Sequence, residues 1–382
     1  MWSESRKGEN KMVQKKLGFG TLRLPLIGND YGSVNIDIFK KMVDAYLDRG
    51  YTFFDTSYVY HQGKSEIAVR EALVERYPRS AYTVTDKMPV WLIQKYEDYQ
   101  KYFSEQLGRC GLEYFDYYWL HALSSTTVDS SEKFGGFEFL KKMKEVGKVK
   151  HIGFSFHDTA ETLHYILSNH PEMEYVQLIV NYIDWINDGI EIRKCYETVL
   201  EHNKQVIVME PLKGGILANV PEEIEAMFKK YNPKISAAAW ALRWVASLDN
   251  VFMILSGMST IEQLMDNLNT FDQLTQLNNE EQILIEKAQN ILNRKTPNKC
   301  TYCGECQKVC PKNLAIPVYI GLYNNRKMFI ASGWHDILYN AVGARYGKAD
   351  DCNDCKECET VCPQRIKITE LLKDARKVLK PL

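Results

Sequence analysis

The sequence predicts an α/β protein in which a (β/α)8 TIM barrel is followed by a small, cysteine-rich α-helical domain. Two observations lead to this fold class. Short apolar runs alternate with amphipathic stretches from Leu17 to about Thr270, and eight cysteines gather near the C-terminus. Because 382 residues are more than one domain usually needs, we expect one large and one small domain. We predict a disordered lead-in over residues 1–14, the barrel over 15–292 and the cysteine-rich domain over 293–382.

Eight apolar runs have the length and the β-branched and aromatic composition of buried strands. They are LGFGTL, YTFFDT, AYTVTD, FDYYWLH, HIGFSF, YVQLIV, QVIVME and VFMILS. Helical patterns separate them near residues 36–49, 64–77, 93–109, 133–147, 158–169, 188–203, 234–247 and 260–271, and one more covers 279–292. Eight such units within about 255 residues are typical of a closed barrel. A doubly wound sheet is the alternative, but no G-x-G-x-x-G opens a helix in this sequence.

The composition excludes several classes of partner. A net charge of −1 gives no electrostatic reason to bind nucleic acid or an anionic membrane. No apolar run approaches the ~18 residues needed to span a bilayer. The polar N-terminal segment lacks the apolar region of a secretory signal. We therefore expect a cytoplasmic protein with neither a nucleic-acid nor a membrane partner.

The cysteines form two runs with the order C-x2-C-x2-C-x3-C, each followed by proline. This is the bacterial ferredoxin spacing, in which the fourth cysteine of each run ligates the other cluster of a pair. We predict two [4Fe–4S] clusters. One is held by Cys300, Cys303, Cys306 and Cys362, and the other by Cys352, Cys355, Cys358 and Cys310.

Structural zinc is the alternative for these cysteines, since it takes four thiolates from paired C-x2-C knuckles. The two C-P endings favour clusters instead. Cys110 and Cys195 fall in helical patterns, where a buried and unreactive thiol is expected. Between the two runs lie 41 residues that look helical and aromatic-rich, including WHDILYNAVGARYG. We expect this insert to pack the cysteine-rich domain onto the barrel.

Four polar residues follow consecutive strands of the predicted barrel, where barrel active sites lie. Asp55 and Tyr60 follow the second strand, Lys87 the third and His121 the fourth. A nearby ammonium lowers the pKa of a phenol, and an aspartate orients the lysine. Tyr60 is then a candidate proton donor to a carbonyl oxygen, with His121 holding the developing alkoxide. His61 and His157 are expected at the same rim.

The sequence resembles the aldo/keto reductase family across roughly residues 15–292. The resemblance rests on DTSYVYHQGKSEIAVREAL, VTDKMP, YYWLHAL, VKHIGFSFHD, VQLIVN, MEPLKGGIL and LSGMSTIEQLMDNL, in that order. It implies a (β/α)8 barrel, a catalytic tetrad of Asp55, Tyr60, Lys87 and His121, and a nicotinamide cofactor bound without a Rossmann motif. The whole chain resembles the branch of the family with a ferredoxin-like tail.

The resemblance also implies which residues contact the cofactor. Ser155 and Gln177 match positions beside the nicotinamide amide. Positions along the pyrophosphate and at the adenosine end are matched by Pro211, Leu212, Gly215, Ser259, Glu262 and Asn267.

Four positions depart from the family pattern. Phe156 stands where asparagine is usual, and Val180 stands where an aromatic ring usually stacks under the nicotinamide. Gly257 and Gln263 occupy the places of the Lys and Arg that clamp the 2′-phosphate of NADP. Losing the guanidinium fork removes bidentate phosphate recognition. The choice between NADPH and NADH therefore stays open.

Three functions are compatible with these features. The first is reduction of a small carbonyl compound, or oxidation of an alcohol, with NAD(P)H, while the clusters carry electrons to or from a redox protein. The second is electron transfer with a flavin in the barrel, since a cluster moves one electron and a hydride moves two. The third is a non-catalytic docking or sensing role. In each case we expect the cysteine-rich domain to cover or flank the barrel mouth.

Overall fold

A computed structural model describes residues 15–28, 30–187, 191–328, 339, 342–343 and 346–379. The predicted lead-in over residues 1–14 lies outside the described residues, as does much of the WHDILYNAVGARYG segment. Within the described ranges, no helix is both long and apolar enough to cross a membrane.

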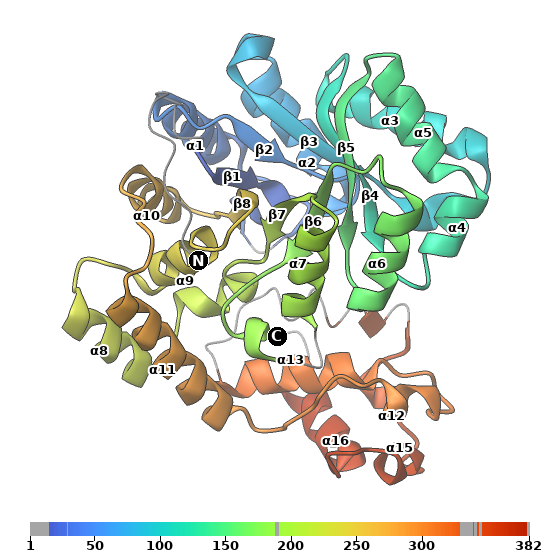
Figure 1. Cartoon of the computed structure of the whole chain (residues 1–382), viewed down its shortest axis with the longest axis vertical. Helices are drawn as coiled ribbons and strands as arrows, with labels where there is room; N and C mark the ends of the chain where they lie inside the picture. The colour runs from blue at the N-terminus through green and yellow to red at the C-terminus, as the bar shows by residue number, and fades with distance from the viewer. Residues whose placement is uncertain are drawn as a thin grey trace.

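Eight parallel strands close into a barrel in which each strand pairs with the next and β1 pairs with β8 (Figure 1). All eight predicted strands are confirmed. Their bounds are β1 Leu17–Gly20, β2 Phe53–Asp55, β3 Thr83–Met88, β4 Phe115–Leu123, β5 Val149–Phe156, β6 Tyr175–Ile179, β7 Gln205–Met209 and β8 Val251–Gly257.

Helices surround the barrel on its outer face (Figure 1). They are α1 Ile36–Asp48, α2 Ser65–Val69, α3 Tyr96–Cys110, α4 Val128–Lys133, α5 Gly136–Glu145, α6 Ala160–Asn169, α7 Ile192–Glu201, α8 Glu222–Tyr231, α9 Ala237–Ala246, α10 Ile261–Asp272 and α11 Asn279–Lys295. The sequence did not predict α8, an amphipathic helix with acidic residues in its first turn and lysines in its last. The predicted helix over 133–147 is α5, and the short α4 before it was not predicted; Gly135, with φ 76°, separates the two helices.

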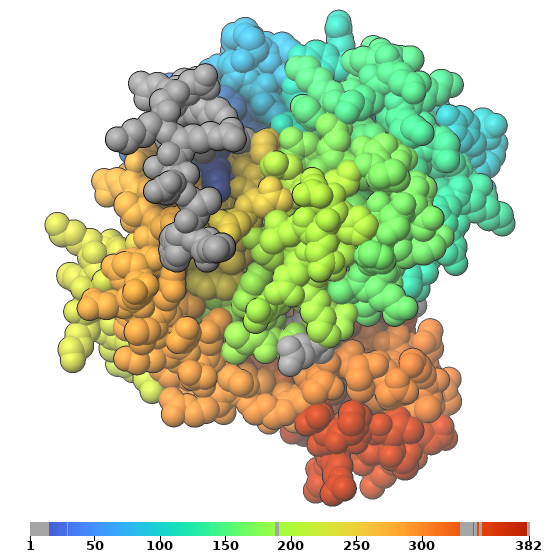
Figure 2. Space-filling view, viewed as in Figure 1, coloured from blue at the N-terminus to red at the C-terminus, as the bar shows by residue number. Residues whose placement is uncertain are grey.

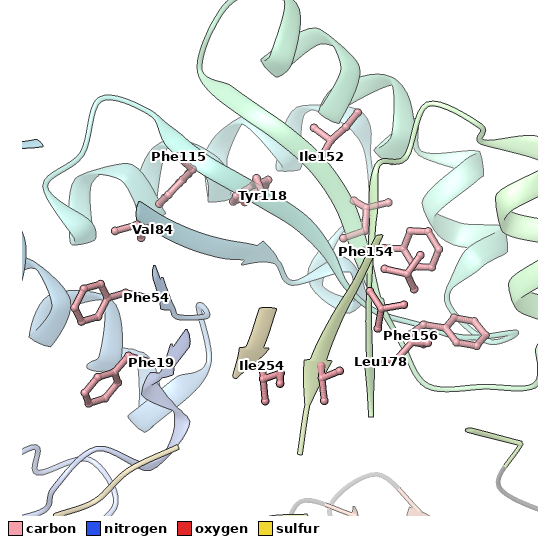
Figure 3. Packing of buried hydrophobic residues seen from close by; sticks show 14 of the residues in the cluster. Phe19, Phe54, Val84, Phe115, Tyr118, Ile152, Phe154, Phe156, Leu178 and Ile254 are labelled. Atoms are coloured by element: carbon pink, nitrogen blue, oxygen red, sulfur yellow. The ribbon is translucent and has the colours of Figure 1, made fainter. Parts of the chain in front are cut away.

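The core has two parts. Strand side chains such as Phe19, Phe54, Phe115 and Phe154 pack outward against the helices (Figure 3). Inside the barrel, a second cluster consists of Phe53, Tyr117, Trp119, Ile207, Met253 and Leu255. Alternation of side chains along each strand separates the two parts, as in other closed barrels.

The cysteine-rich region forms a small helical unit with its own core. Its elements are α12 Glu305–Lys308, α13 Ile316–Met328, the 3-10 turn η8 Ala349–Asp351, α15 Glu357–Thr360 and α16 Ile368–Val378. Leu314, Tyr319 and Leu372 are fully buried in that core. Figure 1 shows α13 on the side facing the barrel and α15 and α16 farther from it, and Figure 2 shows the unit packed directly against the barrel.

This unit contacts the barrel at the carboxyl ends of β6 and β7. Met328 of α13 packs against the cluster that contains Tyr182 and Ile216, which follow these two strands. The phenol of Tyr302 lies close enough to Asp184 to be influenced by its charge. The prediction that the cysteine-rich domain flanks the barrel mouth is therefore confirmed.

We predict that Gly153→Ala destabilises the barrel. A Cβ atom at Gly153 would lie 2.2 Å from the carbonyl oxygen of Tyr175 and 2.8 Å from the Trp119 ring. Because backbone and a buried ring must then move, we expect a loss of about 1–3 kcal/mol in the free energy of unfolding. Thermal unfolding followed by circular dichroism measures it. Gly108→Ala in α3 is the control, since nothing lies within 4 Å of its Cβ position. An equal melting temperature for Gly153→Ala and the native protein would contradict this prediction.

Candidate active site and metal centres

The barrel brings Asp55, Tyr60, Lys87 and His121 to one end. Asp55 is the last residue of β2, and Tyr60 opens a short 3-10 turn, Tyr60–Gly63, that soon follows it. Lys87 and His121 lie near the ends of β3 and β4. Since the strands are parallel and adjacent, these ends meet at the same rim. The rim is the carboxyl end of the barrel, where such folds carry their active sites.

Lys87 is the centre of this group. Its Nζ donates one hydrogen bond to Oδ2 of Asp55 at 2.7 Å and one to the carbonyl oxygen of Thr56 at 2.7 Å. The same nitrogen lies 4.9 Å from the centroid of the Tyr60 ring. Burial by itself would lower the pKa of Lys87, but the nearby charges of Asp55 and Tyr60 outweigh it and hold the pKa above its usual value. Lys87 is therefore an ammonium ion at neutral pH.

Tyr60 is a neutral phenol at neutral pH. Burial raises its pKa to about 12, Lys87 acts in the opposite direction, and Asp55 adds to the increase. The sequence predicted that Lys87 would lower this pKa. Lys87 does lower the pKa of Tyr60, but burial of the ring raises the pKa by more. Tyr60 is thus able to donate a proton at neutral pH.

His121 is neutral as well. Burial, the charge of Lys87 and the neighbouring His157 hold its pKa well below the usual value. Its ring meets that of Tyr60 edge-on at 6.2 Å between centroids. Its Nδ1 is 3.1 Å from the hydroxyl oxygen of Ser57. When Ser57 donates this bond, the proton of the imidazole lies on Nε2, which is then a neutral donor.

A local irregularity in β4 presents His121. The register of β4 against β5 shifts between Leu120 and Leu123, and Ala122 has φ 58°. Oγ of Ser155 on β5 accepts a hydrogen bond from the backbone nitrogen of Ala122 at 2.7 Å. Bulges of this kind often re-aim a side chain next to an active site.

Two residues at this site were not individually predicted from the sequence. Ser57 contacts His121, as described above. Trp91 lies 5.1 Å from the His121 ring, between centroids, and its side chain is 43% exposed. Trp91 follows the strand that carries Lys87, and this position in the sequence could have indicated that it lies at the same rim. An exposed tryptophan beside His121 provides an apolar wall for a bound molecule.

The two other histidines of the rim have different roles. In His61, Nε2 accepts a hydrogen bond from the backbone nitrogen of Leu24 at 3.1 Å, and Nδ1 donates to the carbonyl oxygen of Tyr31 at 2.8 Å. Both ring nitrogens of His61 thus hold the loop after β1. His157 is solvent-accessible at its surface. Loss of hydration around its ring lowers its pKa to about 4, and the charge of Glu210 acts in the opposite direction.

The structure places Ser155 and Gln177 side by side, as expected for a shared amide site. They are paired residues of β5 and β6 and are 1% and 2% exposed. Oε1 of Gln177 has no hydrogen-bond partner among the described residues. The Ser155 hydroxyl accepts the Ala122 bond and can still donate one of its own. A buried polar group of this kind requires a partner, and a carboxamide has the complementary donor and acceptor.

The remaining predicted cofactor residues lie after β7 and β8. Pro211, Leu212 and Gly215 form the turn that follows β7, with Gly215 at φ 92°. Ser259 donates from Oγ to the carbonyl oxygen of Arg23 at 2.9 Å. Glu262 lies in the first turn of α10. Asn267 is buried and donates from Nδ2 to Oγ of Ser256 at 2.8 Å.

Two of the four departures from the family pattern lie in the packed core. Phe156 and Val180 are 3% and 0% exposed and belong to the core between strands and helices. Arg23 from the loop after β1 lies over Gly257, where a Cβ would be 3.5 Å from its Nη1. No motif in the sequence indicated Arg23, which also pairs with Glu210 at 2.8 Å.

The eight clustered cysteines line two separate small cavities. Cys300, Cys303, Cys306 and Cys362 line the first, and Cys310, Cys352, Cys355 and Cys358 line the second. Each group combines three cysteines of one run with the last cysteine of the other. Within the described part of the chain, no three His, Cys, Asp or Glu side chains converge as they would around a single metal ion. Four thiols around a volume fit the donor set of a [4Fe–4S] cluster.

The first cavity is joined to the barrel through Tyr302. The backbone nitrogen of Tyr302 donates to Sγ of Cys300 at 3.4 Å. The Tyr302 phenol is close to Asp184, which forms an ion pair with Lys213 in the turn after β7. The cavity of Cys300 is thus linked through a few residues to the turn that contains Pro211 and Gly215.

Comparison with known proteins identifies the family. The sequence model of the aldo/keto reductase family matches residues 16–290, so the chain belongs to that family of oxidoreductases. Residues 299–367 match the model of a 4Fe-4S dicluster domain, and the cysteine-rich region is thus an iron–sulfur domain. A probable aldo-keto reductase from Glycine max is 29% identical over 294 residues, which cover 66% of this chain and 80% of that protein.

Two further similarities cover the two regions separately. An aldo-keto reductase from Klebsiella pneumoniae, solved in complex with NADPH, has a TM-score of 0.56 and 21% identity, covering 72% of this chain and 95% of its own. A component of the ion-translocating oxidoreductase complex from Buchnera aphidicola is 32% identical over 81 residues, 21% of this chain and 14% of that protein. The first similarity shows the barrel fold.

We predict that His121 stays neutral from pH 8 down to pH 5. Burial, Lys87 and His157 all disfavour its protonated form. NMR of protein with labelled histidine should show that the His121 imidazole keeps its chemical shifts over this range, and His157, with a pKa of about 4, should change little. Lys87→Met is the matched variant, because it removes one of the repulsive charges and should raise the pKa of His121. Titration of every imidazole in the native protein between pH 5 and pH 7 would contradict the prediction.

Proposed function

We propose that the protein reduces the carbonyl group of a small molecule, or oxidises the corresponding alcohol, with NAD(P)H. The observation that carries this proposal is the arrangement at the barrel rim. There Lys87 bonds Asp55 at 2.7 Å, lies 4.9 Å from the Tyr60 ring and faces a neutral His121. A protonated phenol, a fixed ammonium and a neutral imidazole are the groups that carbonyl reduction needs.

Each residue has a distinct role in this reaction. A bound NAD(P)H supplies a hydride to the carbonyl carbon. Tyr60 gives its phenolic proton to the carbonyl oxygen, so that hydride and proton together convert C=O to CH–OH. Lys87 stabilises the phenolate that remains, while Asp55 holds the ammonium in place. Nε2 of His121 donates to the same oxygen as negative charge develops on it.

A nicotinamide cofactor is favoured over a flavin by one feature of the site. Oε1 of Gln177 is buried and unpartnered among the described residues, and it lies beside the Ser155 hydroxyl. These two groups would hold a carboxamide. Pro211, Leu212 and Gly215 would then follow the pyrophosphate, and Ser259, Glu262 and Asn267 the adenosine. The NADPH complex of the Klebsiella pneumoniae neighbour supports this arrangement.

We assign two [4Fe–4S] clusters to the chain, one in each cysteine-lined cavity. Division into a barrel over 15–292 and an iron–sulfur domain over 293–382 follows from the same assignment. We place the cluster of Cys300 nearer the barrel, because Tyr302 of the same segment is close enough to Asp184 to be influenced by its charge. Each cluster site has one exposed cysteine, Cys303 in the first and Cys355 in the second, and the second site would exchange electrons with a redox protein partner. Such clusters suit a cytoplasmic location, where thiols stay reduced.

A non-catalytic docking or sensing role is the remaining candidate. Burying the ion pair of Lys87 and Asp55 costs hydration energy, and a non-catalytic role gives no reason for that cost. We therefore prefer the catalytic role.

Tyr60→Phe is expected to lower kcat about 10²–10⁴-fold, the usual contribution of a general acid. The assay is NAD(P)H oxidation with a broad panel of aldehydes and ketones. NADPH affinity should change little, since the ring is kept. Tyr165→Phe is the matched control, because Tyr165 is a 46% exposed residue of α6. Equal turnover in Tyr60→Phe and the native protein would overturn the proposed chemistry.

The iron–sulfur assignment predicts about eight iron and eight sulfide per chain after anaerobic purification. Metal and sulfide analysis tests this number. An anaerobic visible spectrum before and after addition of NADPH tests coupling, because reduced clusters lose absorbance. Bleaching would show a shared electron path and would require a group with a one-electron state to join hydride and cluster chemistry. An unchanged spectrum would make the barrel an independent carbonyl reductase and leave the domain a docking role.

A further inference from the structure

A second buried polar cluster lies behind Lys87, between the barrel and its helices. It consists of Glu66 from α2, Asp86 from β3, Gln106, Arg109 and Cys110 from α3, and Tyr118 from β4. Glu66, Asp86 and Gln106 are fully buried. Because Asp86 precedes Lys87 in the strand, its side chain points to the opposite side of the barrel wall. The reaction proposed above does not use any of these residues.

This cluster holds both backbone polar groups of Lys87. Oδ1 of Asp86 accepts a hydrogen bond from the backbone nitrogen of Lys87 at 2.8 Å. Nε2 of Gln106 donates to the carbonyl oxygen of Lys87 at 3.0 Å. Tyr118 in turn donates from its hydroxyl to Oε1 of Gln106. The position of Lys87 thus depends on side chains on both sides of the sheet.

The charges of the cluster do not balance if both carboxyl groups are ionised. Oε2 of Glu66 bonds Nη1 of Arg109 at 3.1 Å, and Arg109 is shared with Glu105. The ammonium of Lys87 bonds Asp55 instead. Asp86 and Glu66 are adjacent and hydrogen-bonded to each other, yet Oε1 of Glu66 has no partner among the described residues when both are carboxylates. Because two adjacent, fully buried carboxyl groups disfavour double ionisation, we infer that they share one proton.

Asp86 is the group that carries this proton. Glu66 is the one paired with Arg109. Burial, followed by the charge of Glu66, raises the pKa of Asp86 well above its usual value. Lys87 acts in the opposite direction but does not outweigh burial and Glu66. Cys110 and Tyr118 also face Asp86, and burial raises the pKa of both, so they are neutral.

We propose that Asp86 is a positioning residue for Lys87: a neutral carboxylic acid that donates to Glu66 and accepts the backbone N–H of Lys87. Asp55 is then the carboxylate that faces the ammonium. The inference rests on the proposed role of Lys87 in lowering the energy of the Tyr60 phenolate. An ionised Asp86 would offset part of the Lys87 charge and make the phenolate less favourable.

The neutral state is directly observable. At pH 7 the infrared spectrum of the holoprotein should contain the C=O stretch of a protonated carboxylic acid, shifted in D₂O. Asp86→Asn should remove this band. The control is Asp116→Asn, because Asp116 is also a buried aspartate, on β4, but is paired with Arg79 and Lys150. That variant should keep the band.

Two substitutions separate the electrostatic role from a purely structural one. Asp86→Asn replaces a neutral acid by a neutral amide and should change kcat/KM less than about threefold in either direction. Glu66→Gln removes the negative charge that opposes ionisation of Asp86 and adds an amide N–H donor beside it, so Asp86 ionises. The pKa of Tyr60 should then rise by about one unit. Alcohol oxidation at pH 9 needs the phenolate and should fall about tenfold, because each pKa unit is a factor of ten in phenolate. Carbonyl reduction at pH 7 starts from the protonated phenol and should fall by less than alcohol oxidation, because proton transfer is only partly complete in the transition state.

Several outcomes would overturn the proposal. The first is that the native protein lacks the infrared band. The second is that Asp86→Asn keeps it. The third is that Glu66→Gln loses stability but keeps the native ratio of alcohol oxidation to carbonyl reduction. The infrared comparison does not depend on turnover, so it stays decisive if the barrel does not reduce carbonyls. It also stays decisive if Glu66→Gln does not fold, since it uses Asp86→Asn alone.

Discussion

The buried ion pair between Lys87 and Asp55 is the interaction on which the rest of the site depends. Burying two charges costs hydration energy, and further hydrogen bonds offset this cost. The Lys87 ammonium also donates to the carbonyl oxygen of Thr56, and the Asp55 carboxylate also accepts from the hydroxyl of Thr85. The barrel makes this possible by placing the ends of β2 and β3 in register. One fixed positive charge then acts on Tyr60 and His121 alike, keeping the imidazole neutral and favouring the phenolate.

Polar side chains surround Lys87 on both sides of the barrel wall. Glu66, Asp86, Gln106 and Arg109 surround the backbone of Lys87 from the helix side, while Asp55 binds its ammonium from the rim. Buried polar networks are stable only when every group has a partner. A shared proton between Asp86 and Glu66 is the way in which this network meets that condition.

The iron–sulfur domain is attached where it bears on cofactor binding. It packs against the turns after β6 and β7, and the second of these contains Pro211 and Gly215. Tyr302 connects a cysteine of the nearer cavity with Asp184 and thus with Lys213. The nearer cavity is thus close to the turn that contains Pro211 and Gly215. Through such a turn, binding at one domain can change the binding affinity of the other.

The sequence alone determined the strands, the barrel and the grouping of the cysteines, because these follow from local apolar patterning and from spacing between neighbours in the chain. It also located Asp55, Tyr60, Lys87 and His121, since residues after successive parallel strands must meet at one rim. Only the tertiary structure decided the protonation states. The pKa of Tyr60 rises despite Lys87 because burial is a property of the assembled barrel. Likewise Trp91, Arg23 and the Asp86–Glu66 pair gain their roles from neighbours distant in sequence, which no local pattern specifies.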